Sequence, residues 1–277
     1  MSSSFVNLRV LCGLCLLLLV LDRPGLAQNI GSYLGFDRND YPGDASLQVL
    51  RRTFSYAGYW LNNPPGESGN GWTGKRQLLD SVGFGFLVLF NGRLDKNLKH
   101  NAAALGQSDG QTAAASARRE SFPARTIIFL DIEEGGRMLA EQKTYIYTWV
   151  DAVIAGGFRA GIYCSGIPAK EGKSTIVTAE DIRANAGGRD ITYWVTNDVC
   201  PPSPGCAFSA PRPAQSGIDF ADVWQFAQSP RRSDFAAACR NYNPDKNCYP
   251  PGIDPASHLH VDVNTAASAD PSGGRIH

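Results

Sequence analysis

A regular alternation of short apolar segments with helical or loop segments is the feature that most constrains the fold of this chain. The apolar segments have the length and the β-branched and aromatic content of buried strands. Strands are expected at residues 33–38, 56–61, 83–91, 126–133, 160–165, 191–197, 222–227 and 260–264. Helices are expected around residues 45–53, 75–82, 106–121, 137–156 and 178–186. This alternation predicts parallel βαβ units, and eight strands predict a single α/β domain, a closed (β/α)8 TIM-type barrel.

The last third of the chain departs from this regular pattern. Residues 198–221 are rich in Pro and Cys, and only a short helix around 233–240 fits before the last strand. We therefore expect the final βα units to be irregular. His260, which enters the last strand, is expected near the bottom of the barrel. After Ala266 the sequence is small, polar and rich in Gly, which predicts a flexible tail over residues 267–277.

The N-terminal residues have the composition of a secretory signal. Arg9 provides a weak basic region, residues 10–21 are apolar, and small residues precede a predicted cleavage after Ala27. The apolar run is too short to span a bilayer, which needs about 20 residues. Residues 1–27 are therefore predicted to be a signal peptide and residues 28–266 the barrel domain. We expect a soluble monomer in the bacterial periplasm or medium.

The charge of the chain argues against two classes of partner. Without residues 1–27 the chain has 24 basic and 25 acidic residues, a formal charge of −1. A near-neutral chain is a poor ligand for nucleic acid. The chain also has no Lys/Arg cluster and no basic amphipathic helix, which argues against a membrane surface as a partner after signal cleavage.

Five cysteines lie beyond the signal sequence, and an exported chain passes through an oxidising compartment. The short segments from Cys200 to Cys206 and from Cys239 to Cys248 predict two local disulfides. Cys164 is left over in an apolar strand, where a buried and inert thiol is expected. No C-x-x-C spacing occurs among these five cysteines, so a zinc site is not expected. No cofactor is expected either.

Two carboxylates follow the apolar segment 126–130. Side chains alternate along a strand, so Asp131 and Glu133 share one face and Glu134 points to the other. Two acids a few ångströms apart at the end of a buried strand acquire different pKa values, which leaves one protonated while the other is ionised. Cleavage of a glycosidic bond needs this combination. A salt-bridged or metal-binding acidic strand end is the alternative interpretation.

Other polar residues also stand at the predicted strand ends. In a barrel of this type the carboxyl ends of the strands converge on one mouth, where active sites lie. The mouth is expected to hold Asp37, Arg38, Asp131, Glu133, Tyr163, Asn197, Trp224, Gln225, Asp262 and Asn264. Carboxylates flanked by aromatic rings suit a sugar, which stacks on the rings and hydrogen-bonds to the acids and amides. Trp60, Trp194 and Trp224 are also candidates for the barrel core.

Four of these strands carry motifs that resemble a known family. Gly35-Phe-Asp37, Phe129-Leu-Asp-Ile-Glu133, Val223-Trp-Gln-Phe226 and Val261-Asp-Val-Asn264 resemble the pattern of glycoside hydrolase family 25, a family of barrel-shaped lysozymes. With Tyr59-Trp60-Leu61 and Gly161-Ile-Tyr163, the chain is more similar to a related group of secreted bacterial barrels, the glycoside-hydrolase-like domain of unknown function 1906. The resemblance extends over roughly residues 32–266, and the order and spacing of the motifs make the set specific.

The resemblance implies roles for individual residues. Glu133 would be the general acid that protonates the leaving oxygen, and Asp131 would orient an N-acetyl group or stabilise positive charge in an oxocarbenium-like transition state. Asp37 would be the second catalytic carboxylate. Arg38 could pair with Asp37 or Glu133, which would lower the pKa of the acid and weaken it as a proton donor. The residues expected to bind the substrate are Asp262, Trp224, Gln225, Tyr163, Asn197 and Arg38.

Three functions fit these residues. The first is a secreted hydrolase that cleaves an amino-sugar polymer such as peptidoglycan by carboxylate acid/base catalysis. The second is a glycan-binding barrel without turnover, which Arg38 beside the acids would favour. The third is an enzyme that depends on Mg²⁺ or Ca²⁺ held by Asp37, Asp131, Glu133 and Asp262. It ranks last, because His or Lys residues often complete such a site and only His260 stands near a predicted strand end.

Overall fold

The computed structural model describes Met1 and residues 31–233 and 238–276. The described barrel lies within a unit that spans Gly31–His277. The predicted signal peptide and part of the short helix predicted around residues 233–240 lie outside the described residues. The signal peptide and its cleavage after Ala27 therefore stay predictions.

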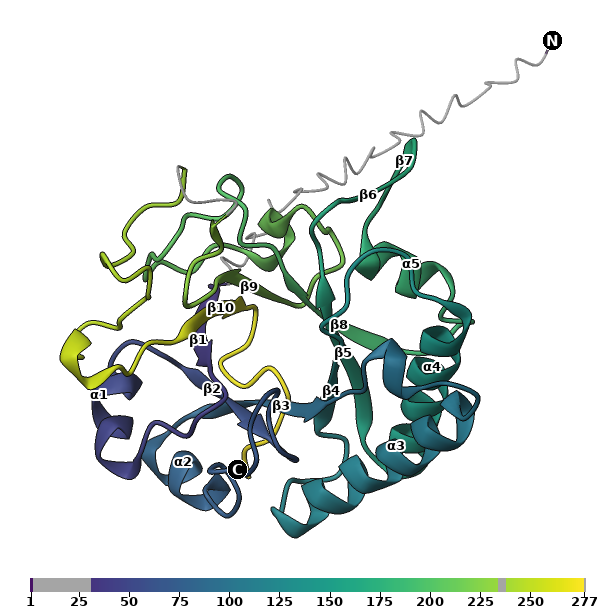
Figure 1. Ribbon diagram of the computed structural model, residues 1–277, viewed down its shortest axis with the longest axis horizontal. Helices are drawn as coiled ribbons and strands as arrows, with labels where there is room; N and C mark the ends of the chain where they lie inside the picture. Colours follow the sequence, from purple (N-terminus) through teal and green to yellow (C-terminus); the bar gives the residue numbers. More distant parts are fainter. Residues whose placement is uncertain (2–30, 234–237, 277) are drawn as a thin grey trace. The chain divides into compact units, whose positions relative to one another are not determined.

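Eight strands close into a barrel (Figure 1). Around the barrel the order is β1-β10-β9-β8-β5-β4-β3-β2. The strands are β1 (Tyr33–Asp37), β2 (Tyr56–Trp60), β3 (Gly85–Asn91), β4 (Ile127–Asp131), β5 (Arg159–Ser165), β8 (Ile191–Thr196), β9 (Val223–Ala227) and β10 (Asp262–Ala266). A separate hairpin joins β6 (Ala169–Glu171) to β7 (Ser174–Ile176). The α/β class, the closed TIM-type barrel and all eight predicted strands are confirmed.

The last strand of the barrel runs in the opposite direction from the others. β10 pairs antiparallel with β1 and with β9, whereas the other six neighbouring pairs are parallel. In this register Asp262, the first residue of β10, lies opposite Asp37, the last residue of β1. The chain therefore enters β10 from the mouth. The expected all-parallel barrel is wrong at this strand, and so is the expectation that His260 lies near the bottom.

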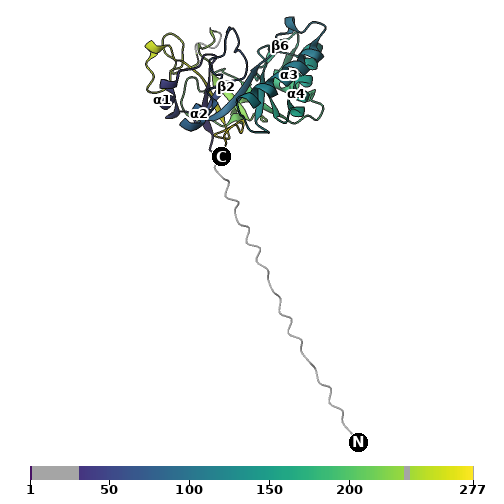
Figure 2. The same ribbon diagram turned by 90° about the horizontal axis from the view of Figure 1, so that it is seen from below.

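The helices cover the outside of the barrel. They are α1 (Leu47–Arg51), α2 (Arg76–Val82), α3 (Ala102–Arg119), α4 (Ala140–Ala155) and α5 (Thr178–Ala184), with short 3-10 helices at Asp44–Ser46, Asp95–Asn97, Pro213–Ser216 and Pro255–Ser257. Figure 2 shows α1 and α2 on one side of the barrel and α3 and α4 on the other. Among the described residues, none of these helices has the length and apolar composition to cross a membrane.

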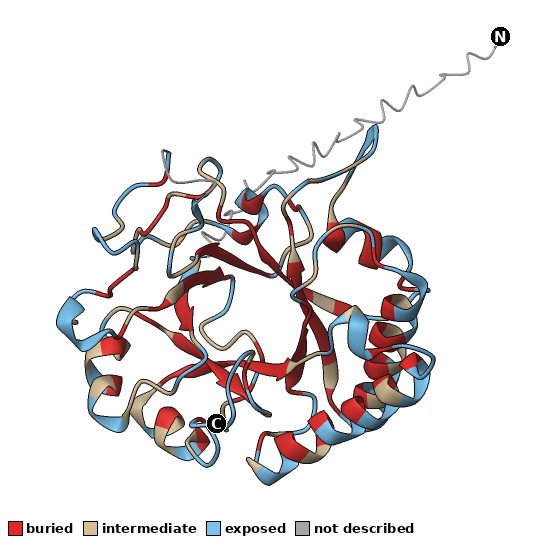
Figure 3. Cartoon of the chain, in the orientation of Figure 1, coloured by how far each residue is buried: buried red, intermediate tan, exposed pale blue. Residues whose placement is uncertain are grey.

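Glycines at inward positions let aromatic rings fill the barrel. A Cβ at Gly35 would lie 2.0 Å from the ring of Tyr56, and one at Gly161 would lie 2.4 Å from the ring of Phe129. Both rings are fully buried, and the strands are buried on both faces, as Figure 3 shows. Between the long helices, a Cβ at Gly106 of α3 would lie 2.5 Å from the carbonyl oxygen of Tyr145 in α4. These contacts require glycine because no other residue leaves the space.

The C-terminal segment packs across the end of the barrel that lies away from the mouth. Ser272 donates its N–H to the carbonyl oxygen of Phe86 and accepts from Ile127 N–H, so it joins the N-terminal ends of β3 and β4. Its hydroxyl accepts from Val88 N–H, and Arg76 donates to the carbonyl oxygen of Gly274. This arrangement differs from the flexible tail expected from composition. The small residues of this segment permit its close packing. Composition alone predicts disorder for the same residues.

Two disulfides connect the long loops that follow β8 and β9. They join Cys200 to Cys239 and Cys206 to Cys248, and Cys164 is free and buried. The predicted pairing of sequence neighbours is wrong because the two loops lie side by side and each disulfide links one loop to the other. Burial raises the pKa of Cys164 to about 12, which fits the inert thiol expected there.

Candidate active site

A cavity and an adjoining groove occupy the mouth of the barrel. The cavity, here called the inner cavity, has a volume of about 140 Å³ and the groove, here called the outer groove, about 670 Å³. The inner cavity is lined by Asp37, Asn39, Trp60, Pro65, Leu89, Asp131, Glu133, Tyr163, Trp194, Gln225, Gln228 and Asp262. The outer groove shares Asn39, Pro65, Asp131 and Glu133 with it and continues over residues 91–94 and Asn97. Asp131 and Glu133 thus stand where the two spaces meet.

The end of β4 presents this pair of carboxyls to the mouth. The Ile132 N–H donates to the carbonyl oxygen of Tyr163, so strand alternation continues beyond Asp131 and brings Glu133 to the same face. Asp131 is only 3% exposed, whereas Glu133 is exposed at the rim. Glu134 points elsewhere and accepts hydrogen bonds from Asp95 N–H and the Gln142 side chain. The spacing in the sequence therefore predicts this geometry correctly.

The pair retains a proton above the usual carboxyl range. Burial raises the pKa of Asp131 strongly, and the charges of Glu133 and Asp37 raise it further. Burial also raises the pKa of Glu133, while a hydrogen bond from Asp131 and the charge of Arg232 lower it. As two carboxylates the groups have no hydrogen to share, so that bond forms only when Asp131 is protonated. The two carboxyls therefore titrate as a unit.

Asp37 is a buried acceptor at the end of β1. Its Oδ1 accepts from Asn264 Nδ2 at 2.6 Å and from Gln225 Nε2 at 3.1 Å. Burial raises the pKa of Asp37 to about 6; the two hydrogen bonds oppose this change and the charge of Glu133 adds to it. A Cβ at Gly58 in β2 would lie 2.7 Å from the Cβ of Asp37. Glycine at that position therefore leaves the space that Asp37 occupies.

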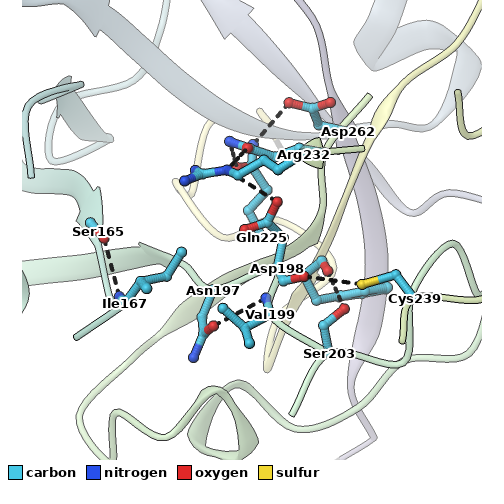
Figure 4. A network of polar contacts seen from close by, with 12 residues as sticks. Ser165, Ile167, Asn197, Asp198, Val199, Ser203, Gln225, Arg232, Cys239 and Asp262 are labelled. Atoms are coloured by element: carbon cyan, nitrogen blue, oxygen red, sulfur yellow. Dashed lines mark hydrogen bonds and ion pairs between the residues drawn. The ribbon is translucent and has the colours of Figure 1, made fainter. Parts of the chain in front are cut away.

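The side chain of Gln225 connects two carboxylates, and its orientation follows from its other partners. Its Oε1 accepts from the Tyr163 hydroxyl at 2.8 Å and from Gln228 Nε2 at 3.1 Å. The Nε2 group therefore faces Asp37 and also Asp262, at 3.1 and 3.3 Å. Figure 4 shows Gln225 and Asp262 in this network. Because the amide donates to both carboxylates, it holds them as acceptors beside the cavity.

Asp262 reaches the mouth from the opposite strand direction. Its Oδ1 accepts from Ser229 N–H at 2.6 Å, in the loop after β9. Burial raises the pKa of Asp262 well above its usual range, and the charge of Asp37 adds to this effect, while the bond from Ser229 lowers it. The antiparallel register places Asp262 directly beside Asp37. The predicted site residue is therefore present, although the expected reason for its position was wrong.

Gln228 and Arg232 belong to the site and are absent from the sequence-based prediction. Arg232 Nε donates to Gln228 Oε1 at 2.7 Å. It also lies 3.2 Å from Asp198 Oδ2, and Figure 4 shows the side chains of Arg232 and Asp198. Gln228 follows directly after the end of β9. The rule that polar residues at strand ends converge on the mouth would have found Gln228. No comparable signal marks Arg232, which lies farther along the loop.

Three predicted substrate-binding residues do not line the inner cavity. Trp224 alternates away from Gln225 and donates to the carbonyl oxygen of Asn197, whose own amide donates to Ser216. Arg38 donates to the carbonyl oxygen of His260 and lies 3.7 Å from Asp40. The expected pairing of Arg38 with Asp37 or Glu133 is therefore replaced by these contacts. The reasons are strand alternation for Trp224 and Asn197, and the nearby entry of β10 for Arg38.

Two tryptophans treated as candidates for the core form walls of the cavity. Trp60 and Trp194 both line it, and Trp194 Nε1 donates to Asn264 Oδ1 at 3.1 Å. The Tyr163 and Trp194 rings lie 4.5 Å apart between centroids. Aromatic walls beside carboxyl and amide groups suit a sugar ring.

The carboxyl cluster has no preformed metal geometry. Within residues 31–233 and 238–276, no group of three or more His, Cys, Asp and Glu side chains is arranged to hold a metal ion. The metal-dependent alternative therefore gains no support from the side-chain geometry. The cluster provides a pair of carboxyls that retains a proton at the junction of the inner cavity and the outer groove. Further hydrogen-bond acceptors lie deeper in the inner cavity.

Comparison with known proteins supports the resemblance found in the motifs. Residues 70–204 match the model of the Rv2525c-like, glycoside hydrolase-like domain. A Bacillus stearothermophilus protein of known structure, described as uncharacterized, has a TM-score of 0.56 and 21% identity, over 84% of this chain and 95% of that one. The Mycobacterium tuberculosis Tat-secreted protein Rv2525c, in complex with HEPES, has a TM-score of 0.51 and 14% identity, over 88% and 98%. These structures share the fold; no curated protein matches the chain.

Proposed function

We propose that this protein hydrolyses glycosidic bonds in an amino-sugar polymer such as peptidoglycan. The observation that carries the proposal is the position of Asp131 and Glu133 at the junction of the inner cavity and the outer groove. A sugar in the cavity, joined to a second sugar in the groove, would have its glycosidic oxygen beside Glu133. A glycoside hydrolase-like domain model matches residues 70–204, which include this pair.

Glu133 is the proposed general acid. Glu133 lines the outer groove and is accessible to solvent, while partial desolvation raises its pKa, so it holds a proton at higher pH than a free glutamate. It donates that proton to the glycosidic oxygen as the bond from carbon to oxygen breaks and the oxygen keeps the electron pair. A water molecule then adds to the sugar carbon, and the proton that it releases returns to a carboxylate.

The carboxylates behind Glu133 stabilise the positive charge that develops on the sugar. Asp37 is the proposed second catalytic carboxylate, because Asn264 and Gln225 hold it as an acceptor in the cavity. Asp131 is proposed to contact the nitrogen substituent of the amino sugar, since both of its oxygens accept no hydrogen bond in the described part of the chain. Fixed acceptors around a developing cation lower the barrier because they need no reorganisation.

The proposed site of action is outside the cytoplasm. The predicted signal peptide and the two disulfides both point to an oxidising compartment. The structurally similar Rv2525c is described as Tat-secreted. We propose release of a monomer that begins after Ala27, which N-terminal sequencing of the exported protein would check.

Hydrolysis is tested by incubating the mature protein with peptidoglycan and with chitin across pH 4 to 8. Turbidity and reducing sugar ends measure turnover. Glu133→Gln is expected to reduce turnover by about 100-fold or more, the usual contribution of a general acid. Glu180→Gln is the matched control, because Glu180 is exposed on α5 and should leave turnover unchanged.

Two outcomes would overturn the proposal in different directions. Saccharide binding without turnover by the parent protein at any pH, retained in Glu133→Gln, would identify a glycan-binding barrel. Turnover abolished by a chelator and restored by Mg²⁺ or Ca²⁺ would identify the metal-dependent alternative.

A further inference from the structure

The inner cavity contains a strong imbalance of charge. Four carboxyls line it, and no Lys, Arg or His is among the described residues of its lining. Cations around the site have other partners. Arg38 contacts Asp40 and the carbonyl oxygen of His260, and Arg232 contacts Asp198. Arg93 lines the outer groove and pairs with Asp109. The Coulomb repulsion between such carboxyls is offset only by protons or by a positively charged ligand.

Asp131 differs from the other two carboxyls deep in the cavity. Asp37 accepts two hydrogen bonds and Asp262 accepts two, whereas both oxygens of Asp131 accept none from the described residues. Asp131 is nevertheless 3% exposed and lines both the inner cavity and the outer groove. A buried carboxylate that accepts no hydrogen bond loses its hydration without compensation, so a ligand that donates to it is favoured.

The volume of the inner cavity limits the size of the nitrogen substituent that a bound sugar can carry. About 140 Å³ is well below the range of roughly 300–1,000 Å³ found for pockets that enclose drug-sized ligands. An acetamido group offers one N–H donor, carries no charge and adds an acetyl group that needs space. A primary ammonium offers three N–H donors and one positive charge on a single nitrogen atom. The ammonium therefore matches both the charge and the volume.

We propose that the inner cavity binds a hexosamine unit that has lost its acetyl group, with the ammonium donating to both oxygens of Asp131. This rests on the proposed function and narrows its substrate class to a partly de-N-acetylated amino-sugar polymer. Asp37 and Asp262 supply further negative charge, and Gln225 holds both in place. Trp60 and Trp194 form the walls against which the ring lies.

Binding of an ammonium is linked to the protons of the cluster. The titratable groups that line the cavity with Asp131 are Asp37 from β1, Glu133 just after β4, Tyr163 from β5 and Asp262 from β10, while the charge of Arg232 acts on Glu133. A cation favours the ionised carboxylates, so binding releases protons to the buffer. The affinity is expected to fall as pH falls, because protonation of Asp131, whose pKa is raised well above its usual range, and of Asp37, whose pKa is about 6, removes the negative charge.

The test compares two tetrasaccharides that differ only in acetylation, the fully de-N-acetylated glucosamine oligomer and its fully N-acetylated counterpart. Calorimetry of the mature protein at pH 6.5, in two buffers with different heats of protonation, measures affinity and proton release. The de-N-acetylated oligomer is expected to bind at least about tenfold tighter, as one charge-assisted hydrogen-bonded contact provides. Asp131→Asn should remove this preference, with circular dichroism to confirm that the variant folds.

Asp219→Asn separates a specific site from general attraction between a cationic sugar and an acidic protein. It removes the same charge from a side chain that is 95% exposed on the surface. Equal losses in Asp131→Asn and Asp219→Asn would overturn the proposal, as would equal or tighter binding of the N-acetylated oligomer by the parent. Turnover of a fully acetylated polymer without ammonium preference would refute only this inference. Ammonium preference without turnover of any polymer would refute only the proposed hydrolysis.

Discussion

At the scale of single residues, the mouth of the barrel contains buried carboxyls that destabilise the fold and that the proposed reaction needs. Asp131 is buried and its oxygens accept no hydrogen bond from the described residues, and Glu133 and Asp37 place further negative charge beside it. Asp37 is buried too, but two amides compensate it. Loss of the charge should therefore stabilise the fold most at Asp131.

Asp131→Asn is expected to stabilise the fold above neutral pH. The pKa of Asp131 is near 4 in the unfolded chain and higher in the folded protein. As pH rises from the unfolded pKa toward the folded pKa, the unfolded chain loses its proton more easily, so the folded state is destabilised. At pH 7.5 the variant should melt about 2–4 °C higher for each kcal/mol gained, and below about pH 4 the difference should vanish. Scanning calorimetry against pH measures both. Asp219→Asn is the control, because it removes a charge from a side chain that is 95% exposed and should leave the melting temperature nearly unchanged.

The charge of Arg232 is expected to set the alkaline limit of activity. It lowers the pKa of Glu133, so Arg232→Gln should raise that pKa and keep the acid protonated to higher pH. The alkaline limb of the kcat/KM profile should shift to higher pH in Arg232→Gln. Arg232→Lys, which keeps the positive charge, should leave the limb where it lies in the parent protein. An unchanged profile in Arg232→Gln would show that this guanidinium does not act on Glu133.

At the scale of elements, the loops after β8 and β9 replace the helices of a regular barrel. Among the described residues they contain only 3-10 turns, and two disulfides cross-link them. These loops carry Asp198, Gln228 and Arg232, and Gln228 extends from them to Gln225 in the cavity. Cross-linking therefore supports the part of the cavity wall that Gln228 forms.

Removing the bridge between Cys200 and Cys239 is expected to destabilise the protein by about 2–4 kcal/mol, the usual effect of a disulfide that closes a loop of this length. The double variant Cys200→Ser/Cys239→Ser, unfolded in urea, measures the loss. It should also weaken saccharide binding, because Arg232 loses its fixed position near Asp198. Cys164→Ala, which removes a free thiol, is the control. Wild-type stability in the double variant would contradict a structural role for this bridge.

At the scale of the whole molecule, the candidate active site and the C-terminal segment lie at opposite ends of the barrel. The carboxyls stand at the mouth, while Ser272 and its neighbours cover the N-terminal ends of β3 and β4. A Cβ at Gly85 would lie 2.0 Å from the carbonyl oxygen of Ala269, which shows how closely the segment packs. The C-terminal segment therefore belongs to the folded barrel.

Ser272→Ala is expected to lower stability by about 1 kcal/mol, because Val88 N–H loses its acceptor in a buried position. Truncation after Ala266 should cost more, since it also removes the backbone bonds to Phe86 and Ile127. Saccharide affinity measured well below the melting temperature should not change in Ser272→Ala. Ser268→Ala is the exposed control. Loss of affinity in Ser272→Ala would contradict the separation of the two ends.

What the sequence determined by itself is local. The two-residue period of the strands predicts the barrel strands and places Asp131 and Glu133 on one face, and the motifs bring Asp37, Tyr163 and Gln225 to the mouth. These inferences succeed because alternation along a strand does not depend on distant parts of the chain.

Only the tertiary structure decided the rest. The direction of β10, the disulfide partners, the docking of the tail on Phe86 and the contact of Arg232 with Gln228 each depend on which loops meet in space. Spacing along the sequence carries no information about such meetings. Strand alternation turns Trp224 and Asn197 away from the cavity, and the closure of the barrel decides that the face with Trp194 and Gln225 is the inner one.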